Sequence, residues 1–216
     1  MRKINKDSPL ASFTDFKDKN PGADWNIDFS KPGCAGHPTY LETRATILIS
    51  EQDCICGYSE IPIDDERDCH IDHFRNRNMF PEHTFNWDNL VAACNDEDFG
   101  AKYKDNKSGI KKPDYAGFFD PVVDSVKDYF YYNERGEIEP HPTLSDPVLQ
   151  AKVQKTIEVF NLQDRSLVNR RKTVIEQIKA YAELTKEEVF DALKFGGFIS
   201  LIQQYTSVKY GKTSPR

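Results

Sequence analysis

The fold of this chain is decided by two stretches of sequence, Ile71-Asp72-His73-Phe74-Arg75 and Trp87-Asp88-Asn89-Leu90-Val91-Ala92-Ala93-Cys94-Asn95. Adjacent residues in extended backbone point to opposite faces, so Asp72 and His73 can serve two sides of one site. The amide of Asn89 can bond to backbone groups and hold the loop between the stretches. A carboxylate or amide just beyond, from Asp98 or Asn95, can add a further oxygen.

These residue types suit the hydrolysis of a phosphodiester bond. An imidazole must take a proton from the attacking water, and a carbonyl behind it fixes its tautomer. A hard divalent cation must hold phosphate oxygens, and it prefers carboxylate and amide ligands. His73 is therefore the candidate base and Asp72 a candidate metal ligand. Asp98 and Asn95 are the alternatives for the second ligand.

Both stretches, together with Phe80-Pro81-Glu82 between them, resemble the PtuB-type HNH (ββα-metal) endonucleases of Septu and some retron anti-phage systems. The similarity covers most of the chain. Further segments that fit the family are Met1-Arg2-Lys3-Ile4-Asn5-Lys6, the Phe119-Asp120-Pro121 turn with the tyrosine-rich segment after it, and Thr156-Ile157-Glu158-Val159-Phe160-Asn161-Leu162.

The resemblance implies a metal-dependent endonuclease that cleaves DNA as the effector of an anti-phage system. His73 would be the general base, Asp72 a metal ligand, and Asn89 the residue that orders the loop. The commoner family spacing favours Asp98 as second ligand, with Asn95 as its rival. Mg²⁺ is the implied metal and Mn²⁺ the alternative. A PtuA-type ATPase is the implied partner, in some systems with a retron reverse transcriptase and its nucleic acid.

The chain departs from the family at two places. Relatives often carry two Cys-x-x-Cys knuckles. Here the position of the second cysteine, three residues after the first, is Ser59 after Cys56 and Glu97 after Cys94. Half of each pair is missing, which argues against a structural zinc. The Pro-Lys that often follows the catalytic histidine is also absent. Nucleic-acid contacts are instead assigned to four basic residues: Arg75, Arg77, Lys102 and Lys104.

Composition restricts the class of protein. The 216 residues are 38% hydrophobic and 12% aromatic, which supports a packed core. A net charge of −6 is unlike that of a non-specific DNA-coating protein, although the segment 101–112 is rich in lysine. Apolar runs such as 45–49 are far shorter than the roughly 20 residues of a membrane helix. We therefore expect a cytoplasmic protein that does not bind membranes.

The expected fold is α+β, with a small ββα-metal module embedded in a mainly helical protein. Residues 1–53 form an N-terminal segment, mostly irregular to Gly33, with Trp25 and Phe29 as anchors and a helix from Pro38 to about Glu51. Residues 54–112 form the module and its basic segment, and the apolar run from Leu90 to Cys94 is predicted to enter a short helix. Residues 113–216 form a hairpin over 128–140 and helices from Asp146 onward, packed as one unit with the module.

Two other interpretations stay open. The chain can be a binding or scaffold subunit that keeps a weak or inactive HNH fold, with 102–112 and the C-terminal helices as its contact surfaces. It can also be a nuclease for RNA or single strands, because the motif binds a phosphate rather than a sugar. Cleavage assays with a His73 variant and with different nucleic acids separate these interpretations.

Overall fold

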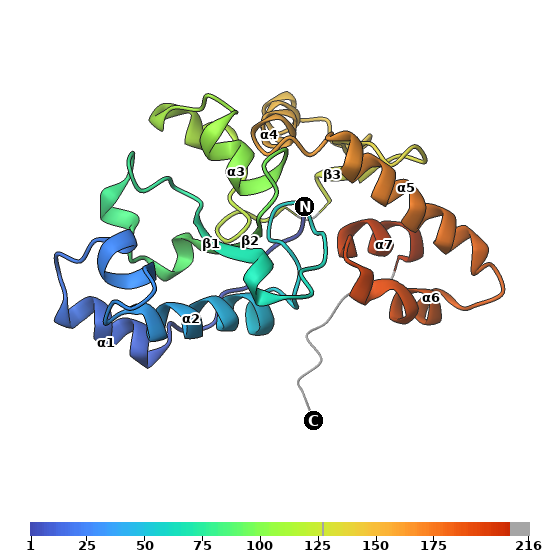
Figure 1. Ribbon diagram of the computed structural model, residues 1–216. Helices are drawn as coiled ribbons and strands as arrows, with labels where there is room; N and C mark the ends of the chain where they lie inside the picture. The colour runs from blue at the N-terminus through green and yellow to red at the C-terminus, as the bar shows by residue number, and fades with distance from the viewer. Residues whose placement is uncertain (127, 208–216) are drawn as a thin grey trace.

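The computed structural model describes residues 1–126 and 128–207. This part of the chain is α+β, with helices around small antiparallel sheets (Figure 1). Its α-helices are α1 (Ala11–Lys19), α2 (His37–Ala45), α3 (Gly100–Asn106), α4 (Pro147–Val159), α5 (Arg165–Ala180), α6 (Lys186–Leu193) and α7 (Ile199–Thr206). Its strands are β1 (Cys69–His73), β2 (Leu90–Cys94), β3 (Phe130–Tyr132) and β4 (Ile138–Pro140). Trp25–Ser30 and Thr46–Glu51 are π-helical, and 3₁₀ turns occupy Glu66–Asp68, Pro81–His83, Trp87–Asn89, Lys112–Gly117 and Lys194–Gly196.

The central element is the antiparallel pair of β1 and β2, in which Asp72 lies opposite Val91 and His73 opposite Leu90. The prediction that 90–94 enters a helix is wrong, because this run is β2. Its first four residues are fully buried, so the polar alternation typical of a half-exposed strand is absent. The side-chain amide of Gln52 extends the pair by accepting from the Ala92 N–H and donating to the Ala92 carbonyl, at 2.9 and 2.8 Å.

The N-terminal region is more regular than its polar sequence predicts, since α1 lies within the segment expected to be irregular. Phe13 and Phe16 sit on one side of α1 and pack on Phe29 with ring centroids 5.8 and 4.9 Å apart. Trp25 and Phe29 are buried, which confirms both as anchors. The predicted helix at 38–51 is also confirmed: α2 runs on into the π-helical segment.

The C-terminal half consists of a hairpin and helices whose first turns are capped by polar side chains. The predicted hairpin is formed by β3 and β4. Asp146 caps α4 and Asp164 caps α5 through bonds from backbone N–H groups, and Thr185 forms a capping box with Glu188 at the start of α6. In Figure 1, α5, α6 and α7 lie on the opposite side of the β1–β2 pair from α1 and α2. Residues 127 and 208–216, within the third predicted region, lie outside the described part.

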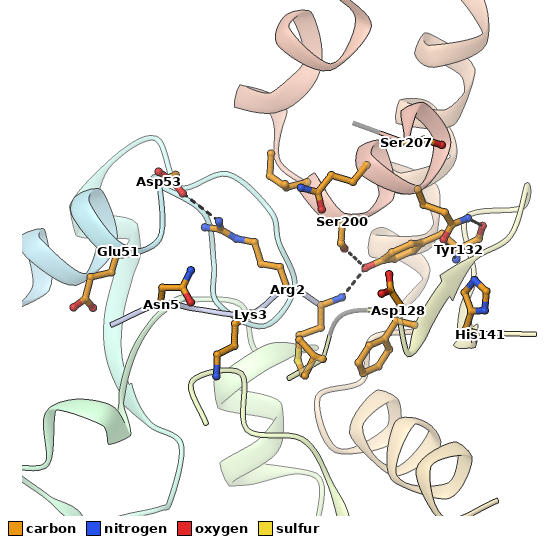
Figure 2. A pocket seen from close by; sticks show the side chains of 16 residues that line it. Arg2, Lys3, Asn5, Glu51, Asp53, Asp128, Tyr132, His141, Ser200 and Ser207 are labelled. Atoms are coloured by element: carbon orange, nitrogen blue, oxygen red, sulfur yellow. Dashed lines mark hydrogen bonds and ion pairs between the residues drawn. The ribbon is translucent and has the colours of Figure 1, made fainter. Parts of the chain in front are cut away.

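A cavity of about 580 Å³ lies between the first residues of the chain, β3 and α7 (Figure 2). At its edge the Met1 ammonium is buried, 2.9 Å from Oε1 of Glu60 and 2.7 Å from the Tyr132 hydroxyl. Ser200 donates to the same carboxylate from its backbone N–H and its hydroxyl, at 2.8 and 2.5 Å. Glu60 therefore ties the N-terminal segment to α7.

Residues 1–126 and 128–207 include no helix that combines the length and the apolar character needed to cross a bilayer.

We predict that Glu60→Gln lowers the free energy of unfolding by roughly 3 kcal/mol, because it leaves the buried Met1 ammonium without its counter-charge. Urea unfolding measures the effect. Glu183→Gln, at an exposed position, is the control and should change little. A loss no larger than that of the control would contradict the role of Glu60.

The same carboxylate predicts a pH dependence. Burial works to raise its pKa, but the Met1 ammonium and the Ser200 hydrogen bonds outweigh burial and lower the pKa of Glu60 to about 2. Burial lowers the pKa of the Met1 amine, although the charge of Glu60 and the hydrogen bond to it act to raise it. Because the folded-state pKa of Glu60 is depressed, its contribution is complete above pH 4.5 and is lost as the pH falls towards 2. Glu60→Gln should remove this part of the acid dependence.

Candidate functional site

The end of β1 places Asp72 and His73 at the centre of the molecule, and both side chains are buried. Antiparallel pairing with β2 fixes their backbone, and the Asn89 carbonyl accepts from the Phe74 N–H at 2.9 Å. The two side chains enter different surroundings: Asp72 meets a tyrosine and a lysine, whereas His73 meets a tryptophan and a loop carbonyl.

His73 is held by the loop between the strands. Its Nε2 lies 2.9 Å from the Thr84 carbonyl oxygen, and because a carbonyl only accepts, Nε2 carries the proton and Nδ1 is left as the basic nitrogen. Trp25 packs edge-on against the ring at 4.4 Å. Burial, assisted by the charge of Arg77, lowers the pKa of His73 to about 3, so the imidazole is neutral at physiological pH.

Asn89 fastens both ends of that loop. Its Oδ1 accepts from the Arg75 N–H at 2.7 Å, and its Nδ2 donates to the carbonyls of Arg75 and His83 at 3.1 and 3.0 Å. The amide is buried, so these bonds replace contacts with water. The loop that carries Thr84 is thereby set against the end of β1.

The negative charge of the buried Asp72 carboxylate is balanced by a positive charge inside the protein. Its Oδ2 accepts from the Tyr58 hydroxyl at 2.5 Å and lies 3.2 Å from the Lys104 ammonium. Burial works to raise the pKa of Asp72, but Lys104, His70 and the Tyr58 hydrogen bond outweigh it and lower the pKa. The carboxylate is therefore ionised, with one oxygen fully engaged.

Lys104 comes from the buried face of α3 and has no exposed side-chain surface. Besides Asp72, its Nζ contacts Asp105 at 2.9 Å and the carbonyls of His73 and Phe74 at 2.9 and 3.1 Å. Burial works to lower the pKa of Lys104, but the two aspartates outweigh it and raise the pKa. This placement departs from the predicted phosphate contact, because the ammonium does not reach the surface.

A cavity of about 170 Å³ opens beside these residues. Asp72, His73, Arg77 and Lys102 are the predicted site residues that line it, and they are joined by other polar groups: His70, Asn76, Asp105 and Asn106. Asp105 and Asn106 were not singled out from the sequence. Their position on α3, within the lysine-rich segment 101–112, is the signal that could have identified them.

The predicted second metal ligands lie elsewhere. Asp98 is largely exposed and pairs with Lys107 at 2.8 Å. It precedes the turn at Gly100, whose φ of 71° starts α3. The Oδ1 atom of Asn95 accepts from Nδ1 of His70 at 3.0 Å, and its Nδ2 donates to the Arg67 carbonyl at 3.2 Å. Neither lines the cavity beside Asp72.

The predicted surface cations are mostly engaged with neighbouring groups. Arg75 donates to the His83 ring at 3.0 Å, Arg77 to Asn26 at 3.2 Å, and Lys102 pairs with Glu97 at 2.7 Å. Because Arg77 and Lys102 also line the cavity, they are the cations that a phosphate entering it would meet first.

The fit of a divalent cation to this arrangement is poor. Within 1–126 and 128–207, no group of three or more histidine, cysteine, aspartate or glutamate side chains is placed to hold a metal ion. The Oδ2 atom of Asp72 already has two donors, one of them a cation. The two incomplete knuckles lie together: the Ser59 hydroxyl is 3.9 Å from the Cys94 sulfur, and the Cys94 N–H donates to the Cys56 sulfur at 3.5 Å. Cys56 and Cys94 provide two thiols there, whereas a structural zinc takes four ligands.

Tyr58, the partner of Asp72, and Thr84, the partner of His73, were not predicted from the sequence. Neither belongs to a spacing pattern. Tyr58 is brought in by a bridge between residues 55 and 62, and Thr84 follows a 3₁₀ turn. These contacts depend on tertiary structure alone.

We predict that Asn89→Ala costs roughly 2–3 kcal/mol of unfolding free energy, because it leaves buried backbone groups at both ends of the loop unsatisfied. Hydrogen exchange should show faster exchange of the Arg75 amide. Asn78→Ala, at an exposed position of the same loop, is the matched control. Equal exchange rates of the Arg75 amide in the two variants would contradict the role of Asn89 in holding the loop.

His73 predicts a second pH effect. Its folded-state pKa of about 3 lies below the ordinary value of 6.5, so the unfolded chain binds a proton first as the pH falls. The contribution of His73 to stability is therefore complete above pH 6.5 and is lost progressively towards pH 3. The NMR chemical shifts of the His73 ring should stay unchanged from pH 8 to pH 5. A titration of these shifts near pH 6.5 would contradict the lowered pKa that follows from burial of the ring.

The comparisons with known proteins assign no family. No protein-family model matches the chain, and no curated protein matches it.

Proposed function

We propose that this chain is an HNH-type endonuclease that hydrolyses DNA phosphodiester bonds, with β1, β2 and α3 as its ββα module. The observation that supports this most is the setting of His73. The neutral imidazole presents an unprotonated Nδ1, because its Nε2–H is held by the Thr84 carbonyl in a loop that Asn89 fixes through hydrogen bonds. The ring lines a cavity that also exposes Arg77 and Lys102.

The chemistry of these residues follows from their positions. His73 takes a proton from water at Nδ1. Burial and the charge of Arg77 oppose the imidazolium that forms, whereas Asp72 and the Thr84 carbonyl stabilise it. Arg77 and Lys102 hold the phosphate through its non-bridging oxygens. The resemblance implies Mg²⁺ or Mn²⁺ as well, but Asp72 as placed is engaged by Tyr58 and Lys104. We therefore assign no step to a metal bound there.

The biological role rests on the resemblance of the motif alone. We propose an effector of anti-phage defence that works in the cytoplasm with a PtuA-type ATPase, in some systems beside a retron reverse transcriptase and its nucleic acid. The net charge of −6 fits this dependence, because an acidic protein has weak affinity of its own for DNA.

A second candidate function is a binding or scaffold subunit with an inactive HNH fold. The specific observation that favours it is the occupied carboxylate of Asp72. An inactive subunit would bind its partner equally well with and without His73.

The test is cleavage of plasmid DNA by the chain together with its ATPase partner in Mg²⁺ or Mn²⁺. His73→Ala should reduce the rate at least a hundredfold, because general-base catalysis contributes about 10²–10⁴-fold. His141→Ala, on the distant hairpin, should cleave at the parent rate. Cleavage by His73→Ala at the parent rate would overturn the catalytic assignment. Parallel assays with duplex DNA, single-stranded DNA and tRNA define the substrate.

A further inference from the structure

Two thiols meet where the incomplete knuckles lie together, and neither of them lines the cavity beside Asp72 and His73. Cys56 follows the bridge that residue 55 makes to residue 62, and Cys94 is the last residue of β2. The Cys94 N–H donates to the Cys56 sulfur at 3.5 Å, and a hydrogen bond joins the two thiols directly. The two sulfurs are therefore neighbours, although 38 positions separate them in the sequence.

The surroundings of this pair favour one thiolate and one thiol. Burial works to raise the pKa of Cys56, but hydrogen bonds from the side chains and backbone N–H groups of Cys94 and Ser59 outweigh it and lower the pKa to about 6. The same thiol–thiol contact raises the pKa of Cys94, because its proton is the one that the two sulfurs share. A thiolate is the form of cysteine that an oxidant attacks, and a thiol next to it can resolve the product.

A small oxidant can approach the pair from the end of β2. Cys56 is fully buried, whereas Cys94 keeps 6% of its surface exposed. The residues directly after it, 95–97, are exposed or half-buried, so Cys94 lies just beneath the surface. A hydroperoxide is small and uncharged, and it can therefore enter where a larger disulfide reagent cannot.

We propose that Cys56 and Cys94 are a redox pair, a modification site that closes to a disulfide on reaction with a hydroperoxide. The Cys56 thiolate attacks hydrogen peroxide, the O–O bond breaks, and the products are a sulfenic acid on Cys56 and hydroxide. The Cys94 sulfur then displaces the hydroxyl group of the sulfenic acid, which leaves as water with the Cys94 proton. In total, two thiols and one hydrogen peroxide give one disulfide and two water molecules.

The disulfide ties the turn after Cys56 to the end of β2. Tyr58 lies in this turn and donates its hydroxyl to Asp72 at 2.5 Å. Oxidation therefore fixes the segment that holds the Asp72 carboxylate. The redox pair does not depend on the nuclease assignment, because neither His73 nor the cavity takes part in it.

Treatment of the folded full chain with hydrogen peroxide tests the proposal, followed by alkylation of the remaining thiols in denaturant and tryptic mass mapping. The number of free thiols should fall by two from the five cysteines of the chain. The tryptic peptides 45–67 and 78–102 should become joined, with a mass about 2 Da below the sum of the reduced peptides, because two thiol hydrogens are lost. Dithiothreitol should separate them again.

The matched control is Cys54→Ser, because Cys54 is an exposed thiol on the same tryptic peptide as Cys56. This variant should form the cross-link to the same extent as the parent, and so should Cys69→Ser, at the buried position opposite Cys94. Cys56→Ser should abolish the cross-link.

The decisive results come from the parent chain, so they do not require any variant to fold. The peroxide concentration is raised until the exposed Cys54 reacts, which provides an internal reference. Cys56 and Cys94 that stay reduced at that concentration, or that become sulfinic acids without a cross-link, would overturn the proposal. A cross-link that uses Cys54 or Cys69 in place of either partner would overturn it as well.

Discussion

An ammonium group removed from water must be surrounded by oxygens and counter-charge, and this requirement of Lys104 organises the centre of the molecule. Its contacts join α3 to the last residue of β1 and the residue after it. Through Asp72 they reach Tyr58, whose ring stacks on Phe160 at 4.3 Å at the end of α4. The buried ion pair thus connects the β1–β2 pair to α3 and to the end of α4.

His73, the next residue of β1, lies in surroundings that favour its uncharged form, whereas those of Asp72 favour its charged form. His73 is packed against Trp25 and stays neutral, while Asp72 is ionised by its partners. Two consecutive residues therefore differ in protonation because their side chains enter different surroundings. The loop clamp of Asn89 supports the histidine side, and α3 supports the aspartate side. This division is what a site with a base on one side and a charged carboxylate on the other requires.

Local signals account for what could be predicted from the sequence. The helical pattern from Asp146 onward predicted the C-terminal helices, because helical spacing and helix caps act within a few residues. The amide chemistry of Asn89 also indicated that its side chain holds the loop, because an amide can both donate to and accept from backbone groups. In contrast, β2 was mistaken for the start of a helix, because burial on both faces removes the alternation that identifies a strand.

The surroundings of Asp72 could not be predicted, since they depend on how α3 docks. The family resemblance favoured Asp98 over Asn95, yet the turn at Gly100 leaves the Asp98 side chain in solvent and α3 brings Lys104 and Asp105 to the Asp72 carboxylate. A lysine in a basic run is ordinarily assigned to the surface. Only the tertiary structure shows that this one is buried.

The central claim is that Lys104, rather than a metal, neutralises Asp72 in the resting protein. Crystals of the parent chain soaked in Mn²⁺ test it most directly through anomalous scattering. The account predicts no anomalous peak within coordination distance of Asp72 and clear density for the Lys104 side chain against it. A peak bonded to Asp72, with Lys104 still in place, would contradict the account.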